Sequence, residues 1–174
     1  MEKELPVRKR IRLKGYDYSN EGYYFITICT HGQQYLLCNV ITANVGQGLC
    51  SCCLLEAGKI VKAELFELKK RYNHIRIDKY VIMPNHIHMI IAVERREQSP
   101  RPTILDIICT YKSITTKRYN KTLGKTGKTL WQSRYHDHII RNEAEYQLIW
   151  QYIDENPIRW KRTYTMLKEP GMII

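Results

Sequence analysis

The sequence predicts an α+β domain built on an antiparallel sheet. Segments rich in β-branched and aromatic residues alternate with segments whose apolar residues recur at helical spacing. The predicted order is β-α-β-β-α-β-α, and its first six elements match the ferredoxin-like split βαβ arrangement, a four-stranded antiparallel sheet with helices on one face. The seventh element is an extra C-terminal helix.

The first half of the chain supplies one strand and one helix. Residues 23–30 (YYFITICT) are typical of a strand. Residues 31–53 carry several Gly and Asn residues and predict an irregular loop or a hairpin. Residues 56–72 place Ile60, Leu65 and Leu68 between charged residues, which predicts an amphipathic helix.

A pair of strands follows. Residues 76–83 and 86–93 are both rich in β-branched types, and Pro84-Asn85 separates them as a tight connection. The charged residues 94–101 then form a loop.

The second helix is predicted from Thr103 to about residue 123, since Asp106 completes a capping-box pattern with Thr103. Residues 135–140 predict the last strand.

The last helix is predicted to begin after Asn142, because Glu145 lies three residues later. It is predicted to end near Asn156, because Pro157 disfavours helical geometry in the residue before it.

The 174 residues fit a basic N-terminal arm, residues 1–15, followed by one domain, residues 16–174. The net charge of +11 favours a polyanionic partner such as nucleic acid. The basic N-terminal segment lacks the apolar run of a secretory signal, and no stretch approaches the roughly 18 apolar residues of a membrane span. We therefore expect a cytoplasmic protein with no membrane partner.

Three cysteines, Cys50, Cys52 and Cys53, lie close together in the sequence. Their spacing lacks the second C-x-x-C of a structural zinc site, which favours a variable loop over a metal centre.

Two histidines begin the strand at residues 86–93. Side chains alternate along a strand, so His86 and His88 point to one face while Ile87 points to the other. Two imidazoles on one face form a bidentate metal site with open positions, as a catalytic metal requires. A second pair, His136 and His138, has similar geometry, although Asp137 between them suggests an exposed polar edge.

The segment at residues 124–129 (GKTGKT) resembles a phosphate-binding loop but has only two residues between its glycines, where the motif requires four. It also precedes a predicted strand and not a helix. We therefore expect no nucleotide cofactor, and a basic loop that touches DNA phosphates fits the segment better.

Tyr152 and Asn156 share one face of the last helix, four residues apart. An ordinary phenol has a pKa of about 10 and is a poor nucleophile at neutral pH, so a divalent ion on the attacked phosphate would assist it. Packing of Tyr152 in the core is the alternative. The chain has thirteen tyrosines, and Tyr111 and Tyr119 on the second helix are rivals.

Three blocks of the chain together resemble REP-associated tyrosine transposases, members of the wider single-tyrosine transposases of insertion sequences. They are residues 80–91 (YVIMPNHIHMII), 131–142 (WQSRYHDHIIRN) and 152–157 (YIDENP). The resemblance spans about residues 23–160. The cysteine-rich residues 49–53 are not part of the family pattern.

The resemblance implies a ferredoxin-like fold and a Mg or Mn ion held by His86, His88 and Asn156. It assigns Tyr152 as the nucleophile that attacks a DNA phosphate, which gives a 5′-phosphotyrosine link and a free 3′-hydroxyl. It implies single-stranded DNA near a hairpin as substrate, and either a monomer or a homodimer. His138 falls in the second block and is expected to support the site, whereas the resemblance gives no role to His136.

Basic side chains on or beside the second helix and the late blocks are candidate DNA contacts. They are Lys112, Lys117, Arg118, Lys121, Arg134 and Arg141, with His138. A solvated charged surface is the alternative interpretation.

Two other functions stay open at this point. A ferredoxin-like sheet can bind nucleic acid without chemistry, although no RNP-type aromatic motif is present. A metal hydrolase that uses water as its nucleophile is the other.

Overall fold

The computed structural model describes residues 20–42, 50–94 and 102–168. Its main sheet is antiparallel, with strand order β4-β5-β1-β6. The strands are β1 (Gly22–Cys29), β4 (Ile75–Ile82), β5 (His86–Val93) and β6 (His136–Ile140). This order and direction confirm the predicted ferredoxin-like sheet. The expected basic arm at residues 1–15 lies outside the described residues.

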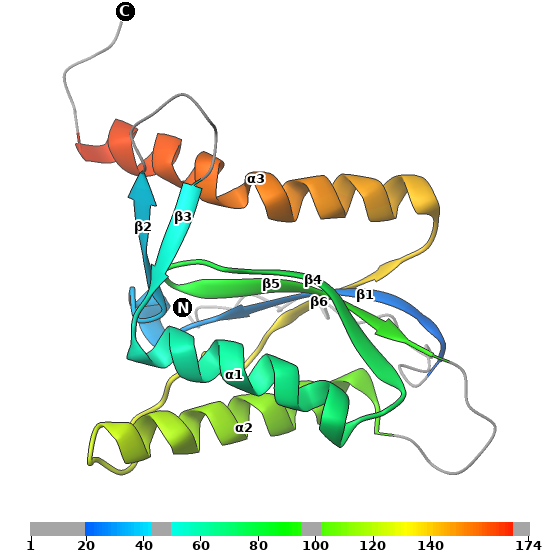
Figure 1. The fold of residues 1–174 in the computed structure, drawn as a ribbon, viewed down its shortest axis with the longest axis horizontal. Coiled ribbons are helices and arrows are strands. Elements are labelled where there is room, and N and C mark those ends of the chain that lie inside the picture. Colours follow the sequence, from blue (N-terminus) through cyan, green and yellow to red (C-terminus); the bar gives the residue numbers. More distant parts are fainter. Residues whose placement is uncertain (1–19, 43–49, 95–101, 169–174) are drawn as a thin grey trace, which may run out of the picture.

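Helices cover both faces of the sheet (Figure 1). Helices α1 (Glu56–Arg71) and α2 (Ile104–Thr122) lie side by side on one face, and α3 (Glu143–Lys168) crosses the other. We call these the α1/α2 face and the α3 face. The first two helices are those predicted for one face, and α3 is the predicted C-terminal addition.

Side-chain alternation divides the apolar residues between two cores. On β5, Ile87, Met89 and Ile91 join the large core under α1 and α2, whereas Ile90 joins a smaller cluster with Ile153 of α3. Every residue of β5 after His86 is buried. The strand that carries the histidine pair is therefore held on both sides.

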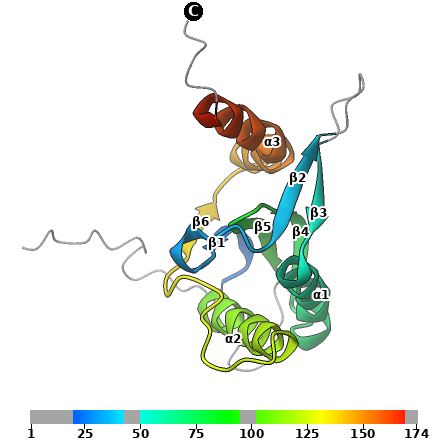
Figure 2. The ribbon, with the colours of Figure 1, turned by 90° about the vertical axis from the view of Figure 1, so that its left-hand side faces the viewer.

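A second, two-stranded sheet extends the fold. Strands β2 (Cys38–Thr42) and β3 (Cys50–Leu54) pair antiparallel and follow a short 3₁₀ segment, η1 (His31–Gln33). The cysteine-rich stretch therefore forms a strand through pairing with β2. This confirms the hairpin, one of the two arrangements predicted for residues 31–53, whereas the variable loop predicted from the cysteine spacing was wrong. Figures 1 and 2 show this hairpin rising beside the C-terminal half of α3.

Helix α3 continues through Pro157 to Lys168, so the predicted end near Asn156 was wrong. Proline removes one helical hydrogen bond and crowds the preceding turn. Here Asn156 and Pro157 are both buried, and this packing outweighs the local preference. Helix α3 therefore continues beyond Asn156, and its residue Trp160 lies next to His86, at the end of the sheet where β5 begins.

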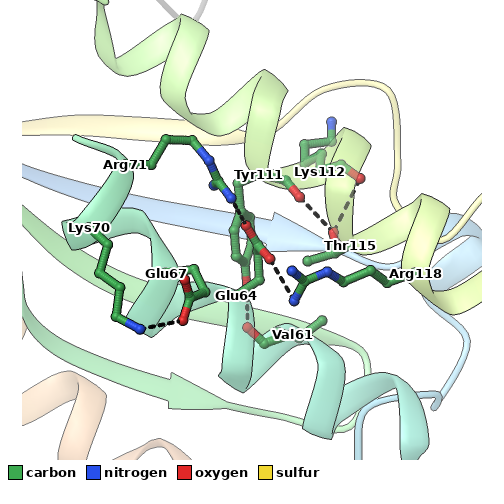
Figure 3. Close-up of polar contacts among 9 residues, drawn as sticks. All are labelled: Val61, Glu64, Glu67, Lys70, Arg71, Tyr111, Lys112, Thr115 and Arg118. Carbon is green, nitrogen blue, oxygen red and sulfur yellow. Dashed lines mark hydrogen bonds and ion pairs between the residues drawn. The ribbon is translucent and has the colours of Figure 1, made fainter.

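An ionic cluster joins α1 to α2 (Figure 3). Glu64 is fully buried, and its carboxylate lies 2.7 Å from Arg71 Nη2 and 3.0 Å from Arg118 Nη1. Beside it, Tyr111 donates its hydroxyl hydrogen to the Val61 carbonyl at 2.9 Å. These contacts fix the two helices on the face opposite α3.

Among the described residues, no helix combines the length and the apolar character that crossing a membrane requires.

Candidate active site

The two histidines of β5 lie on the α3 face, as alternation predicts. Their ring centroids are 4.6 Å apart, and His88 is 5% exposed. Phe25 of β1 stacks on the His88 ring at 5.3 Å between centroids. The hydrogen bond from Met83 N to His86 O, 2.8 Å, closes the tight connection between β4 and β5 and positions the pair.

Each imidazole has one nitrogen engaged by a neighbour. His88 Nδ1 lies 2.8 Å from Thr27 Oγ1, and His86 Nδ1 lies 2.7 Å from Asn85 Oδ1. Because the Asn85 carbonyl oxygen accepts only, His86 carries its proton on Nδ1. These contacts orient both rings through their Nδ1 atoms, and His88 Nε2 lies on the side of Tyr152.

Burial keeps both rings neutral. Desolvation lowers the pKa of His86 to about 4, against the opposing effect of its hydrogen bond with Asn156. Desolvation, with weaker contributions from His86 and His136, lowers the pKa of His88 to about 3. Neutral imidazole is the form that binds metal ions.

Helix α3 brings Tyr152 and Asn156 to the pair. The Tyr152 hydroxyl lies 3.4 Å from His88 Nε2, and Asn156 reaches His86 one helical turn later. Tyr152 is 37% exposed, so it is not a core residue, whereas Asn156 is buried. The structure thus places together all four residues that the sequence proposed.

The helix is held in this position by contacts on either side of Tyr152. Ile153 is buried against the sheet, and Asp154 lies 2.5 Å from Lys79 Nζ of β4. Nearer the start of the helix, the Tyr146 hydroxyl donates to Asp78 Oδ2 at 3.2 Å. A single chain therefore supplies both the imidazoles and the phenol.

The donor set fits a divalent ion. Two imidazoles that burial keeps neutral lie beside one amide side chain, Asn156, and imidazole and amide groups are ligands that divalent ions accept. No group of three His, Cys, Asp or Glu side chains suited to a metal occurs in the described part of the chain. Beside the two histidines, the Asn156 amide is a further side chain that could hold a metal ion.

A family model described as "Transposase IS200 like" matches residues 56–156, more than half of the chain. The chain belongs to the IS200-like transposase family. The match begins with α1, includes His86 and His88, and ends at Asn156. The family predicted from the three sequence blocks is therefore confirmed.

Two individual proteins and one solved structure are similar to this chain. An uncharacterized protein of Haemophilus influenzae is 33% identical over 172 residues, which cover 89% of this chain and 91% of that protein. The REP-associated tyrosine transposase of Escherichia coli K12 is 28% identical over 90 residues, 52% of this chain and 48% of that one. A solved REP-associated tyrosine transposase bound to a REP hairpin shares the fold, with a TM-score of 0.53 and 20% identity over 89% of this chain and 74% of its own.

The second histidine pair of this transposase family member also lies on the α3 face. Register places His136 opposite Thr27, which is itself opposite His88. His138 Nε2 lies 2.7 Å from Glu145 Oε1 and so links β6 to the start of α3. Asp137 is buried, so the expected exposed position for it was wrong, although β6 is an edge strand.

The candidate DNA contacts fall into two groups. Lys112, Lys117, Arg118 and Lys121 lie on α2, on the face of the sheet opposite α3 (Figure 1). The Lys112 ammonium donates to the carbonyls of Gln132 and Ser133 at 2.7 and 2.9 Å. Arg134 and Arg141 are exposed and flank β6. The second group flanks a strand of the sheet that carries the histidine pair, whereas the first group lies on the helix-covered face opposite the pair.

The residues that orient the imidazoles were not predicted from the sequence. Asn85 could have been noticed because it directly precedes His86. Thr27 carried no signal, since a threonine is ordinary in a strand and only the register reveals its partner.

Replacing Thr27 with valine is expected to slow DNA cleavage about 10- to 100-fold, because loss of the oxygen beside His88 Nδ1 frees that ring to turn. Initial cleavage rates measure the effect. Thr27→Ser is the control and should retain the wild-type rate. Equal rates for the valine variant and the wild type would show that Thr27 does not position His88.

The rival tyrosine Tyr111 is unsuited to be the nucleophile. It is completely buried, desolvation raises the pKa of its hydroxyl, and that hydroxyl donates to Val61 O. Tyr119 packs against the same core on α2.

We expect Tyr111→Phe to retain full DNA cleavage while it lowers the free energy of unfolding by about 0.5–1.5 kcal/mol, the contribution of one hydrogen bond. Thermal melting measures the loss of stability, and the cleavage assay measures the retained activity. A folded but inactive Tyr111→Phe protein would contradict the choice of Tyr152.

Proposed function

We propose that this transposase cleaves and rejoins single-stranded DNA with Tyr152 as its nucleophile. The observation that carries the proposal is the position of the Tyr152 hydroxyl, 3.4 Å from His88 Nε2 on a ring that stays 37% exposed. A nucleophile must be reachable by a large substrate and also adjacent to the group that activates the phosphate. Tyr152 meets both requirements.

His86, His88 and Asn156 would hold the divalent ion, Mg or Mn. Such an ion, when bound, would withdraw charge from the attacked phosphate and orient it. The protein prepares for this by holding both imidazoles neutral and by fixing their Nδ1 atoms on Thr27 and Asn85.

The covalent step exchanges one phosphate ester for another. The Tyr152 oxygen loses its proton and bonds to phosphorus, the bond from phosphorus to the 3′ oxygen breaks, and that oxygen leaves as a hydroxyl with one proton. The product is a 5′-phosphotyrosine link, which conserves the ester energy without a nucleotide cofactor. Attack by a 3′-hydroxyl reverses the step and joins strands.

The proposed substrate is single-stranded DNA beside a hairpin. The net charge of +11 suits a polyanion, and a protein of the same fold is bound to a REP hairpin. In this proposal Arg134, His138 and Arg141, on or beside the edge strand β6, approach the DNA backbone.

The test is an end-labelled hairpin with single-stranded tails, incubated with the protein and Mn²⁺ or Mg²⁺. We expect a covalent protein–DNA adduct that survives denaturation and is absent with EDTA or with Tyr152→Phe. Cleavage without an adduct would indicate a hydrolase that uses water, and binding without cleavage would indicate a non-catalytic module. Either result overturns the proposal.

A further inference from the structure

We propose that Trp160 and Tyr35 form a stacking platform for one unpaired base of the DNA strand that passes over the active site. The inference rests on the proposed function, since it places a DNA strand at Tyr152. The Trp160 ring lies between two others, with its centroid 5.7 Å from Tyr35 and 5.6 Å from His86. It therefore extends the aromatic surface of the site outward from the histidine pair.

The continuation of α3 through Pro157 creates this arrangement. Tyr152, Asn156 and Trp160 are spaced four residues apart, so they share one face of the helix. Tyr152 meets His88, Asn156 meets His86, and Trp160 passes beyond the start of β5 to reach Tyr35. If α3 ended at Asn156, Trp160 would not be held next to Tyr35 and the platform would not form.

The backbone close to Tyr35 is fixed, whereas the Tyr35 side chain is exposed. Two residues later, Leu37 is fully buried, and its N–H donates to the Pro84 carbonyl at 3.0 Å. The Tyr35 side chain is nevertheless 54% exposed. Contact with Trp160 leaves Tyr35 largely exposed, so packing between the two side chains gains little there. Because the planes of the two rings meet at 72°, an unpaired base would stack on the face of one ring and contact the edge of the other, and so cover this surface.

The length of α3 between Tyr152 and Trp160 limits which nucleotide can reach the platform. Eight residues of helix, from Tyr152 to Trp160, span roughly 12 Å. A stacked strand advances roughly 3.4 Å per nucleotide. The stacked base should consequently lie within about four nucleotides of the cleaved phosphate. Aromatic stacking accepts any base, so the platform would anchor the strand without reading its sequence.

The experiment measures binding in the Tyr152→Phe background, where DNA stays intact. Hairpins carry 2-aminopurine at each tail position in turn, within about four nucleotides of the mapped cleavage site. At one position we expect the fluorescence to be quenched on binding, and the quenching to be lost with Tyr35→Leu or Trp160→Leu. Trp160→Phe should restore part of it.

A double-mutant cycle then tests the energetics. An abasic site at that position should weaken binding by the starting protein about 5- to 150-fold, the usual contribution of one stacked base. In the Trp160→Leu protein the same abasic site should change the affinity little. Phe66→Leu is the matched control, because Phe66 is 58% exposed on α1, on the other face of the sheet.

Additive effects of the abasic site and of both leucine variants would overturn the platform. Such a result would leave the proposed nicking activity standing if the wild-type adduct forms. Absence of the adduct from the wild-type reaction would instead overturn the nicking activity itself. Tyr35→Leu alters an exposed side chain, so the cycle can be completed with a folded protein even if Trp160→Leu disturbs α3.

Discussion

Replacing His88 with alanine is expected to abolish adduct formation, by at least about 100-fold, while the affinity for the hairpin stays close to that of the wild type. Loss of a residue that merely orients a metal ligand costs about 10- to 100-fold, and loss of the ligand itself should cost more. Affinity should persist because DNA binding depends mainly on contacts from Lys and Arg to phosphates. Adduct yield and a binding titration at one fixed salt concentration measure the two quantities.

Two further variants sharpen this result. His88→Ala combined with Tyr152→Phe should form no adduct, as Tyr152→Phe alone forms none, because the phenol oxygen that bonds to phosphorus is missing. Detectable adduct from the double variant would mean that another side chain acts as the nucleophile.

Mixing the two single variants shows which chain supplies the tyrosine. Only the His88→Ala chain retains Tyr152, and only the Tyr152→Phe chain retains His88. Because α3 docks on its own sheet through Ile153 and Asp154, we expect the mixture to form no adduct. An adduct on the His88→Ala polypeptide would show that chains exchange α3 and assemble the site between them.

Local patterns were sufficient to predict the sheet. The strand at residues 86–93 was predicted with the observed bounds, because a turn signal at Pro84-Asn85 sets its start and a segment rich in Ile and Val follows. The capping box of Thr103 with Asp106 is present, and Asn142 Oδ1 accepts from Glu145 N at 2.9 Å. These signals work because each depends on residues within a few positions of one another.

The features that could not be predicted all depend on distant partners. The helix continues through Pro157 because the buried Asn156 and Pro157 are stabilised by tertiary packing, which outweighs a local rule. The strand at Cys50–Leu54 exists because β2 pairs with it. The contact of Thr27 with His88 depends on the register between two strands far apart in the chain.

The choice among thirteen tyrosines shows the same limit. Helical spacing relates Tyr152 to Asn156, but spacing alone also fits a packed side chain. The family blocks singled out Tyr152, and the structure adds what the sequence lacked, namely a buried Tyr111 and an exposed Tyr152 beside His88.

Gly58→Ala is expected to destabilise the protein by about 3 kcal/mol, although alanine normally favours a helix over glycine by about 1 kcal/mol. A Cβ atom at residue 58 would lie 1.9 Å from the Leu37 carbonyl oxygen, which is backbone and cannot turn away. That oxygen accepts from Leu55 N at 2.9 Å, and Leu37 N donates to the Pro84 carbonyl at 3.0 Å. Relief of the clash must therefore move α1 or break these bonds.

Thermal melting should show a fall in Tm of about 6–12 °C for Gly58→Ala. Ala63→Gly is the matched control on an exposed position of the same helix, and it should cost only about 1 kcal/mol through helix propensity. If Gly58→Ala melted at or above the wild-type temperature, the close approach of Leu37 to α1 would be wrong. Because Leu37 also bonds to Pro84, directly before Asn85 and His86, the variant that remains folded should cleave more slowly as well. The glycine thus connects the packing of α1 to the turn that positions His86 and His88.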